Sequence, residues 1–242
     1  MLSKTRGVVL HVLPYNDTSS ILHVYTESFG RASYLVARQS GRKTRIPHAF
    51  FLPLSVIEMD VEHLPTRDIQ RIREVKPCYL LTNIPAHPIK NVLALFLSEF
   101  LFRVIRTKES DTRLFEYLYD SIRWLELAEE GIANFHLVFL IHLVRYLGIY
   151  PNAEAFRKGR FFDMMNGVFT DQRPTKHLHY LDTKESIILH RLLRMNYTNM
   201  AIYTFSRYDR LNIIRYILEY YRLHLSDFPE IKSLAVMQNL FD

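Results

Sequence analysis

The chain has 242 residues, of which 48% are hydrophobic, so it is long enough for one large domain or two to three small ones with a substantial core. Its formal net charge is +6, and it contains one cysteine, Cys78. A single cysteine excludes an internal disulfide and a zinc site built from cysteines, and it suits a reducing compartment. Charged residues interrupt the most apolar stretches before they reach about 18 residues, and no secretory signal is recognisable, so we expect a cytoplasmic protein without a membrane span.

The first 80 residues show the pattern of β-strands. Short runs rich in Val, Ile, Tyr and Leu alternate with residues that favour turns. The expected strands cover residues 7–13, 19–26, 32–37, 54–63 and 67–75. Five strands in so short a segment predict a small barrel of the OB-fold type, in which an exposed sheet face and loops bind oligonucleotides.

The rest of the chain shows mainly the period of amphipathic helices. Expected helices begin at Pro88, after Asp111, at Ile132, at Thr183 and after Ser206. An Asn-Gly pair between apolar flanks interrupts this pattern and predicts a hairpin. The sequence therefore predicts an α+β protein, with a five-stranded OB-fold barrel in residues 1–80 and a mainly α-helical domain in residues 81–242 that carries a small β-hairpin insertion at about 152–182.

Local signals mark the ends of some of these helices. Thr183 is expected to cap one helix, and Ser206 with Asp209 resembles a capping box at the start of the last one. Lys90, Arg103 and Arg106 fall outside the apolar stripe of the first helix and are polar positions.

Positive charge gathers at the end of the third expected strand. Residues 1–80 contain eleven Lys or Arg against seven acids, whereas the rest of the chain contains twenty against eighteen. The candidate residues belong to an acid-free basic stretch and to the strand just before it. The strand contributes Arg31 and Tyr34, and the stretch contributes Arg38, Arg42, Lys43 and Arg45. Because basic side chains pair with phosphates and aromatic rings stack on bases, the pattern favours a nucleic-acid contact. A solvated loop that merely keeps the barrel soluble is the alternative.

Three acidic residues alternate along the fourth expected strand, so their side chains share one face. Glu58, Asp60 and Glu62 could in principle bind Mg²⁺ for a nuclease. A tight hairpin turn would instead place Glu62 opposite Arg67 as an ion pair. The same register would pair Glu58 with Arg71. We interpret the row as structural, which leaves a nuclease without a catalytic centre.

Other signals for chemistry are weak. His177 and His179 alternate, with Asp163 or Asp171 as conceivable further metal ligands. Two such histidines are a frequent coincidence in a chain with eleven, so we expect no metal and no other cofactor. Gly-rich phosphate loops, serine nucleophile elbows and HExxH motifs are absent from the sequence. The sequence therefore does not indicate an enzyme.

The last expected helix is basic outside its apolar face. We interpret the apolar face as core packing and the remaining charges as a second basic surface, partly neutralised by Asp209 and Glu219. This surface consists of Arg207, Arg210, Arg215 and Arg222.

Three continuous stretches of the chain carry a family resemblance. The stretch TRGVVLHVLPYNDTSSILHVYTESFGRASYLVAR, with the basic loop after it, resembles the N-terminal barrel of the RecO family of bacterial DNA repair and recombination proteins. The central helix of the family and the turn that follows are similar to LVFLIHLVRYLGIYPN, and its C-terminal end resembles EYYRLHLSDFPEIKSLAVMQNLF. The similarity covers essentially the whole chain in the order of the family.

The resemblance implies a non-enzymatic recombination mediator associated with the nucleoid. RecO proteins bind single- and double-stranded DNA and anneal complementary strands. With RecR they help to load RecA onto strands coated by the single-stranded-DNA-binding protein SSB. The resemblance assigns the main DNA contact to the OB-fold basic loop, which here means Arg31, Arg38, Arg42, Lys43 and Arg45.

Two further implications concern the helical domain. Many members bind zinc through four cysteines in the insertion, whereas this chain has none between residues 151 and 180. Zinc is therefore expected to be absent, and hydrophobic contacts are expected to order the hairpin through Phe161, Phe162, Met164 and Phe169. Members also bind the acidic, Phe-ending tail of SSB in an apolar pocket with basic neighbours, for which the candidates are Arg103, Arg106 and Arg145.

Two alternatives stay open from the sequence. An RNA-binding OB module would have the same barrel and the same basic loop. A Mg²⁺-dependent nuclease would need Glu58, Asp60 and Glu62 free of arginine partners.

Overall fold

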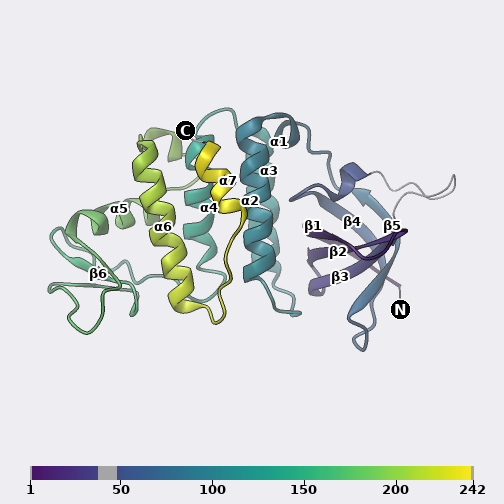
Figure 1. The fold of residues 1–242 in the computed structure, drawn as a ribbon, viewed down its shortest axis with the longest axis horizontal. Helices are drawn as coiled ribbons and strands as arrows, with labels where there is room; N and C mark the ends of the chain where they lie inside the picture. The colour runs from purple at the N-terminus through teal and green to yellow at the C-terminus, as the bar shows by residue number, and fades with distance from the viewer. Residues whose placement is uncertain (1, 38–47, 241–242) are drawn as a thin grey trace. The chain divides into compact units, whose positions relative to one another are not determined.

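The structure is a computed structural model that describes residues 2–37 and 48–240. Its N-terminal part is a closed five-stranded barrel with the strand order β1-β2-β3-β5-β4 (Figure 1). The strands are β1 (Leu2–Pro14), β2 (Ser19–Thr26), β3 (Gly30–Ala37), β4 (Val56–Glu62) and β5 (Ile69–Pro77), and the 3₁₀ turn η1 (His48–Phe51) precedes β4. Neighbouring strands are antiparallel except β3 and β5, which pair in parallel. This is the OB-like barrel that the sequence predicts.

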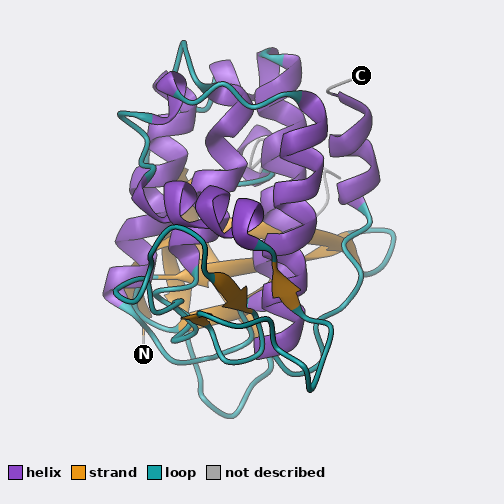
Figure 2. Ribbon diagram, turned by 90° about the vertical axis from the view of Figure 1, so that its left-hand side faces the viewer, coloured by secondary structure: helices purple, strands orange, loops and turns teal. Residues whose placement is uncertain are grey.

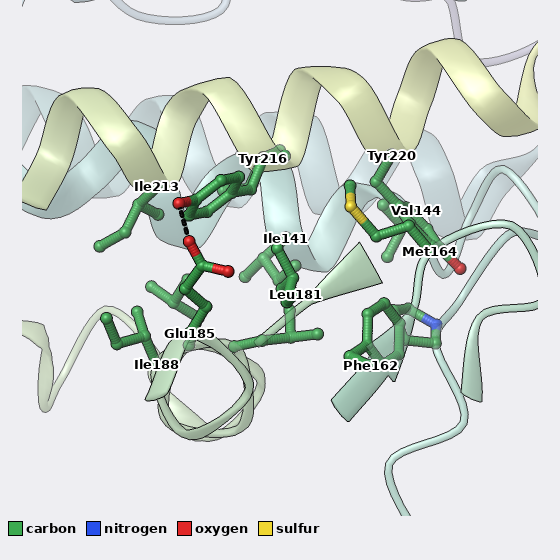
Figure 3. Close-up of a pocket in the computed structure, with 14 residues that line it drawn as sticks. Ile141, Val144, Phe162, Met164, Leu181, Glu185, Ile188, Ile213, Tyr216 and Tyr220 are labelled. Carbon is green, nitrogen blue, oxygen red and sulfur yellow. Dashed lines mark hydrogen bonds between the residues drawn. The ribbon is translucent and has the colours of Figure 1, made fainter. Parts of the chain in front are cut away.

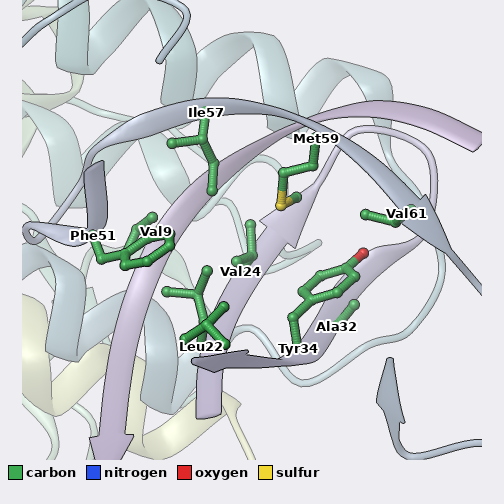
Figure 4. Packing of buried hydrophobic residues seen from close by; sticks show 10 residues of the cluster. Val9, Leu22, Val24, Ala32, Tyr34, Phe51, Ile57, Met59 and Val61 are labelled. Carbon is green, nitrogen blue, oxygen red and sulfur yellow. The ribbon is translucent and has the colours of Figure 1, made fainter. Parts of the chain in front are cut away.

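Alternating side chains of the strands fill the barrel. Every second residue of β2 points inward, so Leu22 and Val24 meet Val9 of β1 and Val61 of β4 in the core (Figure 4). The ring of Tyr34 on β3 lies among them, and all five side chains are at most 1% exposed. The core therefore forms from the alternation that identifies the strands in the sequence.

Helices complete the first compact unit, which comprises the described residues up to Leu127 together with Glu230–Leu240. They are α1 (Asn83–Ala86), α2 (Pro88–Val104), α3 (Thr112–Leu127) and α7 (Ser233–Leu240). Pro88 occupies the first turn of α2, and the Asp111 carboxylate caps α3, as the sequence predicts. This unit extends beyond the barrel, and the domain boundary after residue 80 stays a prediction.

Glu126 near the end of α3 organises the start of the helical part. Its carboxylate accepts hydrogen bonds from the backbone N–H groups of Thr82, Asn83 and Ile84. Lys90, outside the apolar stripe of α2, is nevertheless only 3% exposed and donates from Nζ to the Glu126 carbonyl oxygen at 2.9 Å. Carbonyl groups at a helix end need donors, and a neighbouring helix supplies one here.

The described residues 128–229 form the second compact unit. Helices dominate it, and its strands are short (Figure 2). Its elements are η2 (Ile132–Asn134), α4 (Phe135–Leu143), β6 (Phe161–Asp163), β7 (Val168–Thr170), β8 (Tyr180–Leu181), α5 (Thr183–Arg194), η3 (Met200–Ile202) and α6 (Arg207–His224). α4 is buried on nearly every side, as the sequence predicts for a central helix, and Tyr221 of α6 donates its hydroxyl to the Leu140 carbonyl.

The predicted hairpin is present in the insertion. β6 and β7 pair antiparallel around Asn166-Gly167, where Gly167 adopts a φ of 66° that favours glycine. Phe162, Met164 and Phe169 are at most 5% exposed, which confirms that hydrophobic contacts hold this segment. The Phe161 ring lies at the edge, against Tyr180.

The side chains of the insertion do not fit the cysteine zinc site of the family. The only cysteine of the sequence, Cys78, lies at the end of the barrel. In the insertion, the Phe156 ring stacks on His190 with 3.8 Å between ring centroids and packs edge-on against Phe169. Aromatic packing therefore occupies this part of the chain, and we derive no role for zinc.

Helix caps are partly as predicted. Ser206 and Asp209 form the expected capping box at the start of α6. Asp182, not Thr183, caps α5, because Asp182 has the extended backbone of an N-cap and forms a capping box with Glu185. The sequence did not predict α1 or α7. None of the helices among the described residues has both the length and the apolar character needed to cross a membrane.

Candidate nucleic-acid interface

Most of the predicted basic loop lies outside the described residues. This applies to Arg38, Arg42, Lys43 and Arg45. The chain enters that segment directly after β3 and leaves it at η1, so both of its anchors belong to the barrel unit. The DNA contact assigned to these four residues stays a prediction.

Tyr34 does not have the exposed ring that the base-stacking prediction needs. Its side chain points into the barrel and is 0% exposed (Figure 4). Burial raises the pKa of its hydroxyl above the ordinary range. The prediction for Tyr34 was wrong because alternate residues of a strand face the same side. Tyr34 lies on the inward-facing side of β3 with Ala32 and Val36, which are also buried.

Arg31, the remaining predicted residue, anchors the barrel to α2. Its guanidinium donates to the carbonyl oxygens of Phe102 at 2.9 Å and Ile105 at 3.0 Å. It also lies 4.4 Å from the centroid of the Phe102 ring as a cation–π pair. These contacts fix the Arg31 side chain in one place.

Arg31 lines a concave site that we call the basic hollow, with a volume of about 430 Å³. The hollow lies between the start of β3, the β4–β5 connection and the segment that joins α2 to α3. Its charged residues are the four cations Arg31, Arg67, Arg106 and Lys108 and one acid, Asp68. The sequence pattern indicated Arg31 as a DNA contact but gave no sign of Arg67 and Lys108, because these residues are far apart in the chain and only folding brings them together.

Backbone contacts hold two walls of the hollow against each other. The Arg31 N–H donates to the Thr107 carbonyl at 3.0 Å. Gly30 has a φ of 59°, and a Cβ there would lie 2.3 Å from the Glu109 carbonyl oxygen. Only glycine permits this approach. Gln70 braces the third wall, since its amide donates to the Leu64 carbonyl and accepts from the Leu64 N–H at 2.9 Å.

The electrostatics of the hollow are dominated by like charge. Burial lowers the pKa of Arg31, and the nearby charge of Arg106 lowers it further. The one carboxylate, Asp68, pairs with Lys108 at 3.1 Å, but its side chain is 94% exposed. An ion pair so exposed gains little, so the hollow keeps an excess of positive charge.

The second basic surface on α6 is smaller than predicted. Arg207, Arg215 and Arg222 are exposed, whereas Arg210 is half-buried and donates to the Phe205 carbonyl. Burial also lowers the pKa of Arg210. The Arg210 side chain therefore packs against the start of α6 and does not contribute to an exposed basic surface.

The three candidates for the SSB-tail pocket differ in their surroundings. Arg103 lines an apolar groove of about 990 Å³, bordered by β1, α2 and α7. Arg106 lines the basic hollow instead. Arg145 belongs to the second unit, where it donates to the Tyr150 hydroxyl at 2.8 Å.

A small apolar cavity of about 30 Å³ lies among α4, α5 and α6 (Figure 3). Ile141, Phe162 and Leu181 are among its lining residues, and Tyr216 donates a hydrogen bond to Glu185 at its edge. It has room for only about two water molecules, so it is too small for a nucleotide.

Glu58 and Glu62 in the acidic row of β4 are ion-paired, but not with the predicted partners. The partners are Lys4 and Lys76 for Glu58, at 2.9 and 3.0 Å, and Arg73 for Glu62. The pairing with Arg67 and Arg71 was wrong because a bulge between Asp60 and Val61 shifts the register and the β4–β5 connection is longer than a tight turn. The interpretation of the row as structural does not depend on the register.

The two histidines of the insertion each face a different carboxylate. His177 Nε2 lies 3.4 Å from Asp163, and His179 Nδ1 lies 2.8 Å from Glu219. Within residues 2–37 and 48–240, no three side chains gather as metal ligands.

A five-stranded OB-like barrel with a basic hollow, followed by a mainly helical region, defines the chain as a binding protein of the OB-fold class. The family described as "Recombination protein O N terminal" matches residues 1–81, and "Recombination protein O C terminal" matches residues 86–235. The chain belongs to the RecO family of DNA repair proteins.

Relatives cover the whole chain. A protein named DNA repair protein RecO from Bacteroides fragilis is 47% identical over 242 residues, and one from Azobacteroides pseudotrichonymphae is 46% identical, each over the full length of both chains. A protein of the same name from Flavobacterium psychrophilum is 30% identical, also over the full length of both. The family is one of non-enzymatic recombination mediators, which excludes the nuclease and places the chain in DNA repair and recombination rather than among RNA-binding modules.

Proposed function

We propose that this protein captures DNA strands electrostatically, aligns complementary strands for annealing and, together with RecR, promotes loading of RecA onto SSB-coated DNA. The DNA contact consists of Arg31 and the basic loop residues Arg38, Arg42, Lys43 and Arg45. The protein acts without a cofactor, and it contacts the phosphate backbone rather than reading bases.

The observation that carries the proposal is the concentration of positive charge on the barrel of a RecO-family chain. Most of the surplus of basic residues lies in residues 1–80, and two of the three walls of the basic hollow belong to the same barrel. Both anchors of the loop, Ala37 and His48, belong to that unit too. A polyanion is the partner that such a surface fits.

Salt dependence tests the loop assignment. Each phosphate neutralised on a single strand contributes a slope of about −0.7 to the log–log dependence of affinity on salt. Changing Arg42, Lys43 and Arg45 together to Ala should therefore flatten the slope by roughly two units. The affinity of both proteins for a labelled single strand would be measured by anisotropy across a salt series.

A matched control removes the same charge elsewhere. Arg157, Lys158 and Lys176 are exposed residues of the insertion, and their joint change to Ala lowers the net charge equally. This control should leave the slope close to that of the unmodified protein. An equal slope for the loop variant and the unmodified protein would refute the loop assignment.

The apolar groove beside Arg103 is the best-supported place for the SSB tail. It exposes Leu95 and Val236, which are 42% and 50% exposed, and Lys232 adds a second cation at its border. An acidic tail that ends in an aromatic residue fits an apolar groove with basic neighbours. Arg106 and Arg145 lie elsewhere, so we assign only Arg103 to this role.

A further inference from the structure

We propose that the basic hollow binds one unpaired nucleotide of a DNA strand, with its phosphate among the four cations and its base beside the stacked rings of Phe29 and His63. The proposal rests on the DNA binding of the proposed function. It deepens that function by naming the ligand of one site and by giving the protein a means to prefer single strands over duplex.

The shape of the hollow suits a single nucleotide. Its volume of about 430 Å³ lies within the range of roughly 300–1,000 Å³ for pockets that hold small ligands. Bases of a duplex are paired and stacked, and must leave the helix before they can enter a concave site. Bases of a single strand do not carry that cost. A hollow of this kind therefore discriminates in favour of unpaired nucleotides.

The charges of the hollow suit a phosphate. Arg31 is held in place by its bonds to the Phe102 and Ile105 carbonyls, and the positive charge of Arg106 nearby lowers its pKa. Among the described residues, no hydrogen bond or ion pair holds the Arg67 guanidinium, which is exposed. An anion that enters the hollow relieves this repulsion and gains charge-assisted hydrogen bonds.

The aromatic pair supplies a flat apolar surface. The rings of Phe29 and His63 stack with 4.0 Å between centroids and 7° between planes. Burial lowers the pKa of His63, so the imidazole is neutral at neutral pH and acts as a ring rather than as a fifth cation. Its Nδ1 atom makes no hydrogen bond within the described structure. Bases stack on such rings without regard to sequence.

The hollow is also formed before any ligand arrives. The close approach of Gly30 to Glu109 and the hydrogen bond from Arg31 to Thr107 fix two of its walls. Gln70 fixes the third through its bonds to Leu64. A site that needs no ordering loses less free energy on binding.

The test removes two cations that are not part of the scaffold. In the Arg67→Ala, Lys108→Ala variant, affinity for a labelled single strand should fall at least fivefold more than affinity for a duplex of equal length, as a rough estimate at moderate salt. The matched control, Arg71→Ala with Lys76→Ala, changes two exposed cations of the same barrel outside the hollow. The affinity of this control variant for single strands and its affinity for duplex should fall by the same factor.

A second measurement isolates the base. An oligonucleotide with abasic positions should bind the unmodified protein more weakly than an intact strand of the same length. A Phe29→Leu variant should lose this difference, because the rings no longer stack. Circular dichroism and thermal unfolding check that each variant is folded. Should the double Ala variant fail to fold, Arg67→Gln with Lys108→Gln keeps the side-chain volume and tests the same charges.

The outcomes separate this inference from the proposed function. An unchanged ratio of single-strand to duplex affinity in the hollow variant, with DNA binding otherwise intact, overturns the nucleotide pocket alone. Failure of the unmodified protein to bind DNA overturns both proposals. A changed ratio without any effect of abasic positions also overturns the pocket, because it leaves the cations as backbone contacts only.

Discussion

At the scale of single residues, several polar side chains of the barrel serve packing. His23 on β2 lies between Ser33, with its Nδ1 at 2.9 Å from the Ser33 hydroxyl, and the Phe102 ring at 4.9 Å between centroids. Burial, together with the smaller effects of the charges of Arg31 and His11, lowers the pKa of His23 to about 4. The pKa of His11 is also lowered, chiefly by burial. The charge of Arg103 lowers this pKa further, whereas the charge of Glu99 raises it. The imidazoles are therefore neutral packing groups in the folded protein.

We predict a loss of stability at mildly acidic pH that His23 causes in part. The pKa in the folded state, about 4, is below the ordinary value of 6.5, so the unfolded chain takes up a proton first as the pH falls. The free energy of unfolding should therefore decline between about pH 6.5 and 4, and the half-buried His23 should account for about 1–2 kcal/mol after screening. Urea unfolding at pH 7 and pH 4.5 measures this change.

The His23→Gln variant supplies the comparison, because Gln can still bond Ser33 but does not titrate. It should lose less stability than the unmodified protein over the same pH interval. An equal loss in both would show that His23 contributes nothing to the pH dependence.

At the scale of elements, α7 shows how a single carboxylate can attach a helix. Glu99 in the middle of α2 accepts from the N–H groups of Lys232 at 3.1 Å and Ser233 at 2.8 Å, and from the Ser233 hydroxyl. These groups stand at the start of α7, where N–H groups lack partners within the helix. Burial alone would raise the pKa of Glu99, but the hydrogen bonds from Ser233 and Lys232 and the charge of Arg103 outweigh it and leave the pKa lowered.

We predict that Glu99→Ala loosens α7 while the barrel stays folded. Loss of the acceptor leaves donors without partners, which costs about 1–3 kcal/mol. Hydrogen exchange should therefore show faster exchange of the amides of α7, with little change in β2 and β4. Glu230→Gln, which changes an exposed acid close to the same helix, is the control and should leave that exchange unaltered. Equal protection of α7 in all three proteins would show that Glu99 does not hold the helix.

At the scale of the whole molecule, the chain forms two compact units that each combine segments of different character. The first joins the barrel to α1, α2, α3 and the returning α7, and the second joins α4, α5 and α6 to a small sheet. The basic hollow and the groove beside Arg103 both belong to the first unit. One unit therefore carries the proposed contacts to DNA and to the SSB tail.

We predict that the protein anneals complementary strands coated with intact SSB at least roughly tenfold faster than strands coated with SSB that lacks its acidic tail, because tethering raises the local concentration. The Val236→Glu variant should reduce this advantage by placing a negative charge in the groove. Leu178→Glu changes a side chain that is 81% exposed in the second unit and should have no effect. Annealing followed by fluorescence quenching measures the rates. Equal rates on the two kinds of SSB would refute the groove assignment.

The sequence by itself determined the elements whose signals are local. Alternation along β1 to β5, the Asn166-Gly167 turn, Pro88 at the start of α2 and the Ser206–Asp209 capping box are all present as predicted. Each depends on residues a few positions apart, so the pattern is readable without the fold. The family resemblance gave the architecture and the family for the same reason, since it depends on continuous stretches.

Only the tertiary structure decided which side chains meet. The alternation of β3 buries Tyr34, and a distant helix end accepts the buried Lys90. The long β4–β5 connection and a bulge together bring Arg73 to Glu62. The basic hollow likewise draws its four cations from three segments that lie far apart in the chain. Register, burial and charge convergence depend on long-range packing, and no local pattern in the sequence encodes them.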